Sequence, residues 1–161
     1  MPPGWIPGGD HPGEGMTRQI AFLAWLLFTS LYAVARGGAP ERIAAATLFG
    51  GALLSVYVAN PFDARFRHVE TGVLLVDIAI MGIMLWISVR STRFWPIWLA
   101  ALLAAEIGVH LMRLAFPGLI PQAYMDTTSL WSWVAQFLLL AGTWRHRRRL
   151  RRTGADVPWK R

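Results

Sequence analysis

The sequence contains no cysteine. This absence excludes disulfide bonds, thiolate metal sites and a cysteine nucleophile, although it does not assign a compartment. Charge is also scarce, because only 16% of the 161 residues are charged whereas 55% are hydrophobic. A soluble domain of this length needs more polar surface than this composition supplies.

Recognisable catalytic motifs are absent as well. The sequence has no Gly-rich phosphate loop, no His-Glu-x-x-His zinc helix and no Gly-x-Ser-x-Gly nucleophile elbow. It also shows no inverted repeat of the kind found in many transporters. We therefore predict a protein that is not an enzyme and that carries neither a metal nor a cofactor.

What the sequence does contain is a series of long hydrophobic runs. They reach or approach the roughly 20 residues that cross a bilayer. We predict an all-α integral membrane bundle over residues 16–144, flanked by a disordered Pro- and Gly-rich tail (1–15) and a basic cytoplasmic tail (145–161). The predicted spans are about five in number: 19–35, 42–59, 71–89, 94–116 and 128–144.

The first run permits two interpretations. From Met16 it has a basic start, an apolar core and a small-x-small end at Ala33 and Ala35, as a secretory signal peptide does. It is also long enough to stay as a membrane helix, which we favour. Four spans would remain if it were cleaved, and translation that begins at Met16 would remove the tail 1–15.

The distribution of Lys and Arg predicts the orientation. The turns at 36–42 and 90–93 and the segment after 144 share one side and hold two, two and eight basic residues, against three on the other side. We predict a bacterial inner (plasma) membrane protein with its N-terminus outside and its C-terminus in the cytoplasm. Aromatic belts are expected at both interfaces, with Trp95, Trp98 and Trp144 inside and Trp131 and Trp133 outside.

Ionisable side chains inside the predicted spans need a separate explanation, because each costs about 2.5–3.5 kcal/mol on insertion scales. Glu106, His110 and Arg113 lie on one face of the fourth span, and Glu70 and Asp77 lie on one face of the third. Such residues normally face other helices and are paired there.

The tight turn at 90–93 makes the third and fourth spans an antiparallel hairpin, so their depths can be compared. At about 1.5 Å per residue, Asp77 falls level with His110, and Glu70 falls level with Arg113. We predict a buried polar cluster in the outer half of the bundle, which Gln136 of the fifth span joins at the depth of Glu106: Glu70, Asp77, Glu106, His110, Arg113 and Gln136.

This cluster is compatible with three functions. Polar groups between membrane helices often only hold the helices together, which favours a scaffold or accessory subunit of a membrane complex, with a membrane-protein partner or a second copy. The cluster could instead conduct protons or ions, or permeabilise the membrane. A third alternative is a redox subunit that binds haem or a pigment through His110; a zinc site of His110, Glu106 and Asp77 is the least favoured.

The basic tail is predicted to bind anionic lipid headgroups, at about 1 kcal/mol per basic residue. His146 is interpreted as part of this tail, without another role. No folded module or aromatic interleaving supports binding to nucleic acid. The residues predicted to contact headgroups are Arg145, Arg147, Arg148, Arg149, Arg151 and Arg152.

Several stretches resemble a group of small bacterial multi-pass membrane proteins. They are "RGGAPER", "RFWPIWLAALLAAEIGVHLMRL", "PQAY" and "LLLAGTWRHRRR", and the resemblance covers most of residues 20–149. It implies the helical membrane fold, and it implies no activity, cofactor or catalytic residue.

Overall fold

The chain folds into an antiparallel bundle of helices. The computed structural model describes residues 12–59, 71–116 and 121–160, and for 12–15, Arg113 and 121–129 it describes the backbone only. Over these residues it contains no strand, and it confirms the predicted all-α bundle. The helices are α1 (Pro12–Arg36), α2 (Ala39–Val58), α3 (Thr71–Arg90), α4 (Trp95–Ala115) and α5 (Pro121–Thr153).

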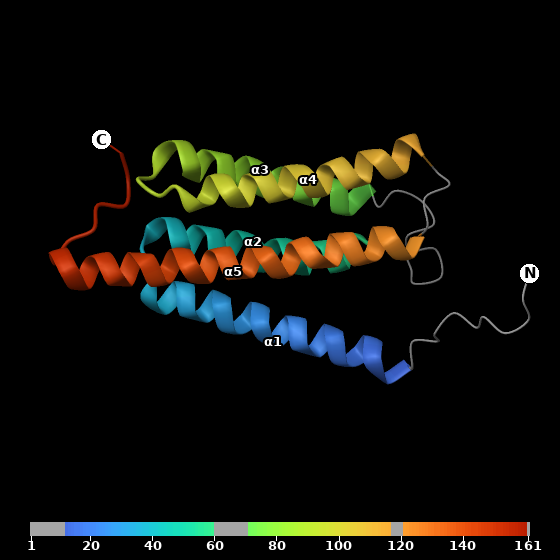
Figure 1. Cartoon of the computed structure of the whole chain (residues 1–161), viewed down its shortest axis with the longest axis horizontal. Coiled ribbons are helices and arrows are strands. Elements are labelled where there is room, and N and C mark those ends of the chain that lie inside the picture. Colours follow the sequence, from blue (N-terminus) through green and yellow to red (C-terminus); the bar gives the residue numbers. More distant parts are fainter. Residues whose placement is uncertain (1–11, 60–70, 117–120, 161) are drawn as a thin grey trace, which may run out of the picture.

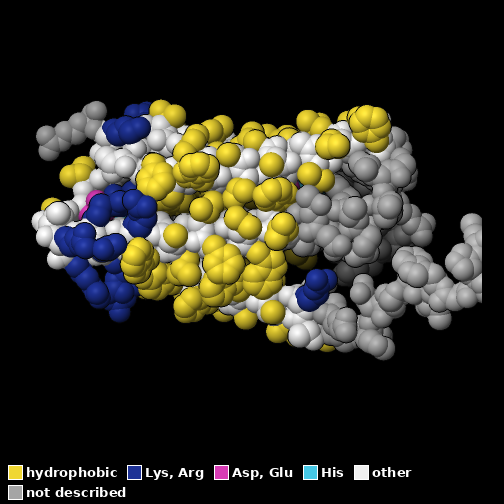
Figure 2. All heavy atoms as spheres, viewed as in Figure 1, with side chains coloured by type: hydrophobic (Ala, Val, Ile, Leu, Met, Phe, Trp, Pro, Cys, Tyr) yellow, Lys and Arg dark blue, Asp and Glu magenta, His cyan; other side chains and the backbone are white. Residues whose placement is uncertain are grey.

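The helices form a closed ring in which each packs against its neighbour in sequence and α5 returns to pack against α1. In Figure 1 the hairpin of α3 and α4 lies on one side of the bundle and α1 lies on the other, with α2 and α5 between them. We call the end where α1, α3 and α5 finish the basic end. Lys and Arg side chains gather there in Figure 2.

Four of the helices, over the described residues, are long and apolar enough to cross a membrane: Met16–Arg36, Ala39–Val58, Thr71–Arg90 and Trp95–Met112. The described part of α5 does not meet this criterion, although the helix runs along the whole bundle (Figure 1). The predicted fifth span at 128–144 therefore stays a prediction. Large apolar side chains cover the outer surface in Figure 2, as expected for helices that face lipid.

The turns at the basic end are short because each helix start is pre-organised. Pro40 and Pro96 stand in the first turns of α2 and α4, where a fixed φ and a missing N–H are tolerated. Gly37 is required by close approach, since a Cβ there would lie 2.4 Å from the carbonyl oxygen of Ala33. Two residues thus separate α1 from α2, and four separate α3 from α4.

Three details differ from the sequence-based expectations. Helix α1 begins at Pro12, inside the tail 1–15 that we predicted to be disordered, whereas residues 1–11 lie outside the described residues. Helix α5 continues through the basic segment to Thr153. Trp95, expected in an interfacial belt, is only 4% exposed because its indole packs between helices, whereas Trp98 and Trp144 are exposed.

The packing of Trp95 leads to a prediction about Gly142. A Cβ on Gly142 would lie 2.7–2.9 Å from three atoms of the buried indole ring. We expect Gly142→Ala to destabilise the bundle by about 1–3 kcal/mol, as overpacking does. Gly82→Ala is the control, because nothing lies within 4 Å of that position. Unfolding in detergent measures both, and the prediction is wrong if the two variants are equally stable.

Candidate functional site

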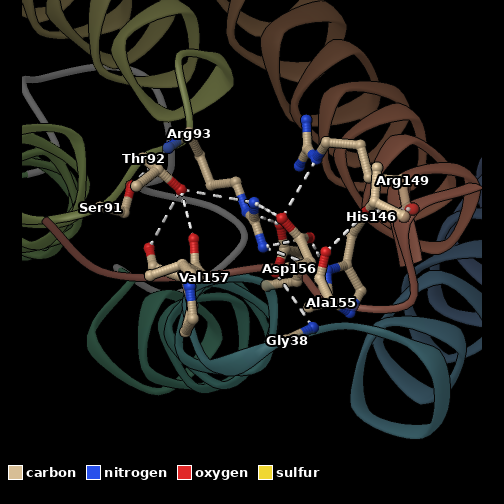
Figure 3. A network of polar contacts seen from close by, with 12 residues as sticks. Gly38, Ser91, Thr92, Arg93, His146, Arg149, Ala155, Asp156 and Val157 are labelled. Carbon is tan, nitrogen blue, oxygen red and sulfur yellow. Dashed lines mark hydrogen bonds and ion pairs between the residues drawn. The ribbon is translucent and has the colours of Figure 1, made fainter.

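The densest group of buried polar side chains lies at the basic end (Figure 3). It brings together Glu41 from the first turn of α2, Arg93 from the turn between α3 and α4, His146 from α5, and Asp156 from the segment after α5. We call these four residues the Arg93 cluster. Its members come from four parts of the chain, so the cluster ties the helix ends together.

Arg93 is the centre of the cluster and is only 4% exposed. Its Nε donates to Glu41 Oε1 at 3.0 Å. Its Nη1 and Nη2 donate to the two carboxylate oxygens of Asp156 at 2.8 and 2.7 Å. This paired geometry is the strong, directional arrangement that a guanidinium makes with a carboxylate. One cation therefore serves two acids that are far apart in sequence.

Glu41 is fully buried and holds Arg93 in place from the other side. Its Oε2 accepts a hydrogen bond from the Gly38 N–H at 3.0 Å, which closes a capping box at the start of α2. Its Oε1 also accepts from Trp95 Nε1 at 3.4 Å. The carboxylate is thus oriented by its own helix start and by α4, independently of Asp156.

His146 Nδ1 lies between a donor and an acceptor. It is 3.0 Å from Arg93 Nη2, which can only donate, and it also contacts Asp156 Oδ2, which in its ionised form can only accept. The contact with the ionised Asp156 carboxylate requires a proton on Nδ1, so the ring donates to Asp156 Oδ2. Arg93 Nη2 has its own hydrogen bond to the same oxygen.

The segment after α5 crosses to the turn between α3 and α4 and is bound there mainly through its backbone. The Thr92 N–H donates to Pro158 O at 3.1 Å, and the Lys160 N–H donates to Arg90 O at 2.8 Å. Thr92 Oγ1 donates to Val157 O at 2.7 Å. The Trp159 ring packs 5.6 Å from the ring of Trp86 on α3, centroid to centroid.

The electrostatics of Asp156 follow from these neighbours. Burial by itself would raise the pKa of the Asp156 carboxyl, but hydrogen bonds from Arg93 and His146 and the charges of Arg93 and Arg149 outweigh it. The pKa of Asp156 is therefore held below its usual value. The ionised carboxylate is the form that binds the segment to the cluster.

This shift predicts how binding of the C-terminal segment depends on pH. An Asp with a lowered pKa stabilises the bound state at pH values above its unperturbed pKa of about 3.9. The stabilisation is lost as the pH falls through the lower, bound-state value. Since the sequence has no native cysteine, a spin label on Lys160→Cys reports on the segment. We expect it to be immobile at neutral pH and to gain mobility as the pH falls below about 3.9.

The control for this pH series is Asp156→Asn. It lacks the titrating carboxyl group but keeps the charged and titratable residues of the site: Arg93, His146, Arg149 and Glu41. Its label should be mobile at every pH, with no transition below pH 5. A transition of the same size in both proteins would assign the pH dependence to a different group.

The membrane-spanning region contains a second group of polar side chains, which includes part of the cluster predicted from sequence. His110 Nε2 of α4 lies 3.2 Å from Asp77 Oδ2 of α3, and both side chains are buried. The distance is that of an ion pair, although the two groups are not aligned as a hydrogen bond. The structure therefore brings together the two residues whose depths we matched along the hairpin.

Glu106 lies one helical turn from His110 on α4 and is also buried. It is close enough to Asp77 for the two carboxyl groups to interact electrostatically. Asp77, Glu106 and His110 thus form a group that we call the membrane triad. In it the imidazole of His110 pairs with Asp77, and Glu106 interacts electrostatically with Asp77.

Gln136 is buried, but its hydrogen-bond partner is not a member of the predicted cluster. Its Oε1 accepts a hydrogen bond from Thr29 Oγ1 of α1 at 2.6 Å. Helix α5 packs against α1 as well as against α4, so Gln136 serves the other side of the bundle. Glu70 and the side chain of Arg113 lie outside the described residues, so their predicted pairing stays a prediction.

The arginines of α5 do not all extend freely into solvent. The guanidinium of Arg145 lies 4.7 Å from the ring centroid of Phe94, and that of Arg148 lies 5.4 Å from the ring of Trp144. Such stacking holds a cation beside an aromatic ring at the membrane interface. The other four lie on the same helix end: Arg147, Arg149, Arg151 and Arg152.

The chemistry available in these clusters is limited. In the part of the chain that the structure describes, no three His, Asp or Glu side chains are grouped so that they could hold a metal ion. The membrane triad has groups that bind and release protons, and the Arg93 cluster has groups that bind carboxylates. The residues of the triad belong to the cluster predicted from sequence, in which Asp77 and His110 are in contact, whereas the sequence analysis missed the Arg93 cluster.

The missed cluster left weak signals in the sequence. We interpreted the basic residues of the turn 90–93 only as a topology signal, and His146 as part of the tail. The structure corrects the interpretation of His146, which is buried and contacts both Arg93 and Asp156. A sign of a segment that folds back was Asp156, which Pro158 and Trp159 follow after one residue, close to the basic residues of α5.

The chain matches no protein-family model, no curated protein and no solved structure in comparisons with known proteins. Its function has to be argued from the two clusters and from the apolar surface.

Proposed function

We propose that this chain is a non-catalytic membrane protein that acts as a scaffold or accessory subunit of a membrane complex. The observation that carries the proposal is the Arg93 cluster, in which buried charges are used in contacts between elements of the same chain. Charges arranged in this way fix the relative positions of helices. A rigid, position-fixing role is what a scaffold requires.

The surface of α2 supports a partner. Ala46 and Gly50, one small-x-x-x-small pair, are exposed, and nothing lies within 4 Å of a Cβ placed on Gly50. The adjacent Gly51 faces inward, where a Cβ would lie 2.4 Å from the Ile80 side chain of α3. The Gly51 face is thus used within the bundle. The Gly50 face is open to a helix of a second protein, as such motifs allow.

The basic end supports the finer assignments of location. Arg36, Arg42 and Arg90 are exposed there together with most of the α5 arginines, whereas Glu41 is buried and the side chain of Asp156 is 7% exposed. An uncompensated basic rim favours a cytoplasmic position against anionic headgroups. We infer an inner-membrane protein of a bacterium with its C-terminus in the cytoplasm and anionic lipids as partners of this rim.

Purification from native membranes in mild detergent tests the proposal. We expect a colourless preparation that contains a second protein in fixed stoichiometry, or a second copy of the chain. Gly50→Leu should abolish the association while the fold remains, whereas Gly82→Leu, at an equally open position, should not. If the unaltered protein and Gly82→Leu are both monomeric and without a partner, the scaffold role is contradicted. A visible absorption band that is lost in His110→Leu would instead indicate a pigment-binding subunit.

A proton-handling function is the second candidate, and the membrane triad favours it. Asp77 lies beside the His110 imidazole and interacts with a second buried acid, Glu106. Such a group can hold a variable number of protons, which a pure packing contact does not need. Proton flux into liposomes that contain the purified protein tests this alternative. It predicts a flux that is lost in Glu106→Gln, and a flux no greater than that of protein-free liposomes would reject it.

A further inference from the structure

The C-terminal segment 155–160 contacts the bundle in the way that a bound peptide contacts its receptor. It begins after Gly154, whose φ of 69° ends α5 in the left-handed region that suits glycine. It then makes a single antiparallel bridge, between Trp159 and Ser91. A carboxylate on Arg93, backbone bonds to Thr92 and Arg90, and one aromatic contact hold it.

Core packing does not explain this attachment. The segment contributes no residue to the buried core of the bundle, and Val157 is 58% exposed. Recognition through strand-like backbone bonds plus one or two side-chain anchors is a common mode of peptide binding. Here Asp156 is the charged anchor, Trp159 is the aromatic anchor, and Pro158 lies between them (Figure 3 shows the anchor at Asp156).

The receptor side is organised without the segment. Glu41 fixes Arg93 through Nε, and Glu41 is itself held by the Gly38 N–H and by Trp95. If the segment leaves, Arg93 still has a buried countercharge and the Thr92 N–H is at an exposed turn. Departure of the segment therefore leaves no buried negative charge without a countercharge. A site of this kind can exchange its occupant.

We propose that the turn 90–93, with Glu41, His146 and Trp86, is a binding site for an extended peptide that carries a carboxylate followed two and three residues later by proline and an aromatic residue. The segment 155–160 occupies it within the chain, and the corresponding segment of a second copy is its ligand in trans. The site adds to the scaffold function a means of joining copies of the chain, and it does not depend on that function.

The test uses the full-length chain with Asp156→Asn, which weakens its own occupant. A fluorescent synthetic peptide of residues 154–160 is titrated into this protein in detergent, and its anisotropy is measured. We expect saturable binding. A control peptide with asparagine at the position of Asp156 should bind about tenfold more weakly or worse, because it lacks the charge-assisted bonds to Arg93. Equal binding of the two peptides, or no binding of either, overturns the proposal.

A second measurement covers the case in which Asp156→Asn fails to fold. The spin label on Lys160→Cys is placed in the chain with native Asp156, and unlabelled peptide is added. A tethered segment competes at an effective concentration of about millimolar, so the peptide has to reach several times that value. Release of the label by the native peptide but not by the control peptide supports exchange. An immobile label at every concentration of both peptides overturns it.

Discussion

Arg93→Gln is expected to destabilise the bundle more than any other single substitution at the basic end. Removing the guanidinium leaves Glu41, which is fully buried, and Asp156, whose side chain is 7% exposed, without their shared countercharge. Breaking a buried pair in this way costs about 3–5 kcal/mol, because an uncompensated charge remains in the interior. Unfolding of the purified protein in a detergent titration measures the loss.

The matched control is Arg90→Gln. Arg90 lies three residues earlier at the end of α3 and is exposed, and only its backbone carbonyl contacts the C-terminal segment. A surface substitution of this kind should change stability by no more than about 0.5 kcal/mol. Combining Arg93→Gln with Glu41→Gln should recover part of the lost unfolding free energy, since the second substitution removes the more deeply buried of the two unpaired carboxylates. If Arg93→Gln is as stable as Arg90→Gln, the cluster does not hold the bundle together.

The bundle itself was predictable because its cause is local and repeated. Each of the first four hydrophobic runs is long enough for a membrane helix, and glycine, proline or a short polar turn separates them. The hairpin of α3 and α4 also fixed a depth relation, since a four-residue turn leaves little freedom of register. This is why Asp77 and His110 could be matched by counting residues from the outer ends of the two spans.

Depth alone does not give direction around the bundle. Gln136 was predicted to join the cluster between the third and fourth spans, yet it bonds to Thr29 on α1. The predicted spans do not specify which neighbour each face of α5 meets. That information comes from the closure of the ring between α1 and α5. A single sequence without homologues carries no signal for such a contact, which joins residues 107 positions apart.

The Arg93 cluster could not be predicted for a related reason. Its residues lie in three segments that sequence reasoning treats as boundaries, where charge has ready explanations in helix dipoles and topology. Only the folded bundle shows that the start of α2 meets the ends of α3 and α5. The indole of Trp95 completes that meeting point, so a residue typical of an interfacial belt is buried instead.

In the membrane-spanning region, His110→Leu is expected to have the largest effect. It removes the imidazole that lies 3.2 Å from the Asp77 carboxyl and leaves two acids, Asp77 and Glu106, buried together. By the same reasoning as for Arg93, we expect a loss of about 3 kcal/mol in unfolding free energy. A smaller loss is expected if a carboxyl group takes up a proton to avoid the charge, because neutralisation is the usual response of a buried ionisable group.

The double variant His110→Leu with Asp77→Leu separates the two functions that the membrane triad allows. Replacing a buried charged pair by apolar residues of similar size is often neutral or stabilising, so the double variant should regain most of the stability lost in His110→Leu. If the pair only holds α3 against α4, the double variant should also keep the association with its partner. If the triad handles protons, the same well-folded protein should show no flux. A double variant no more stable than His110→Leu would mean that the unpaired Asp77 carboxyl does not cause the loss of stability. The contact between Asp77 and His110 would then support neither the packing role nor the proton-handling role.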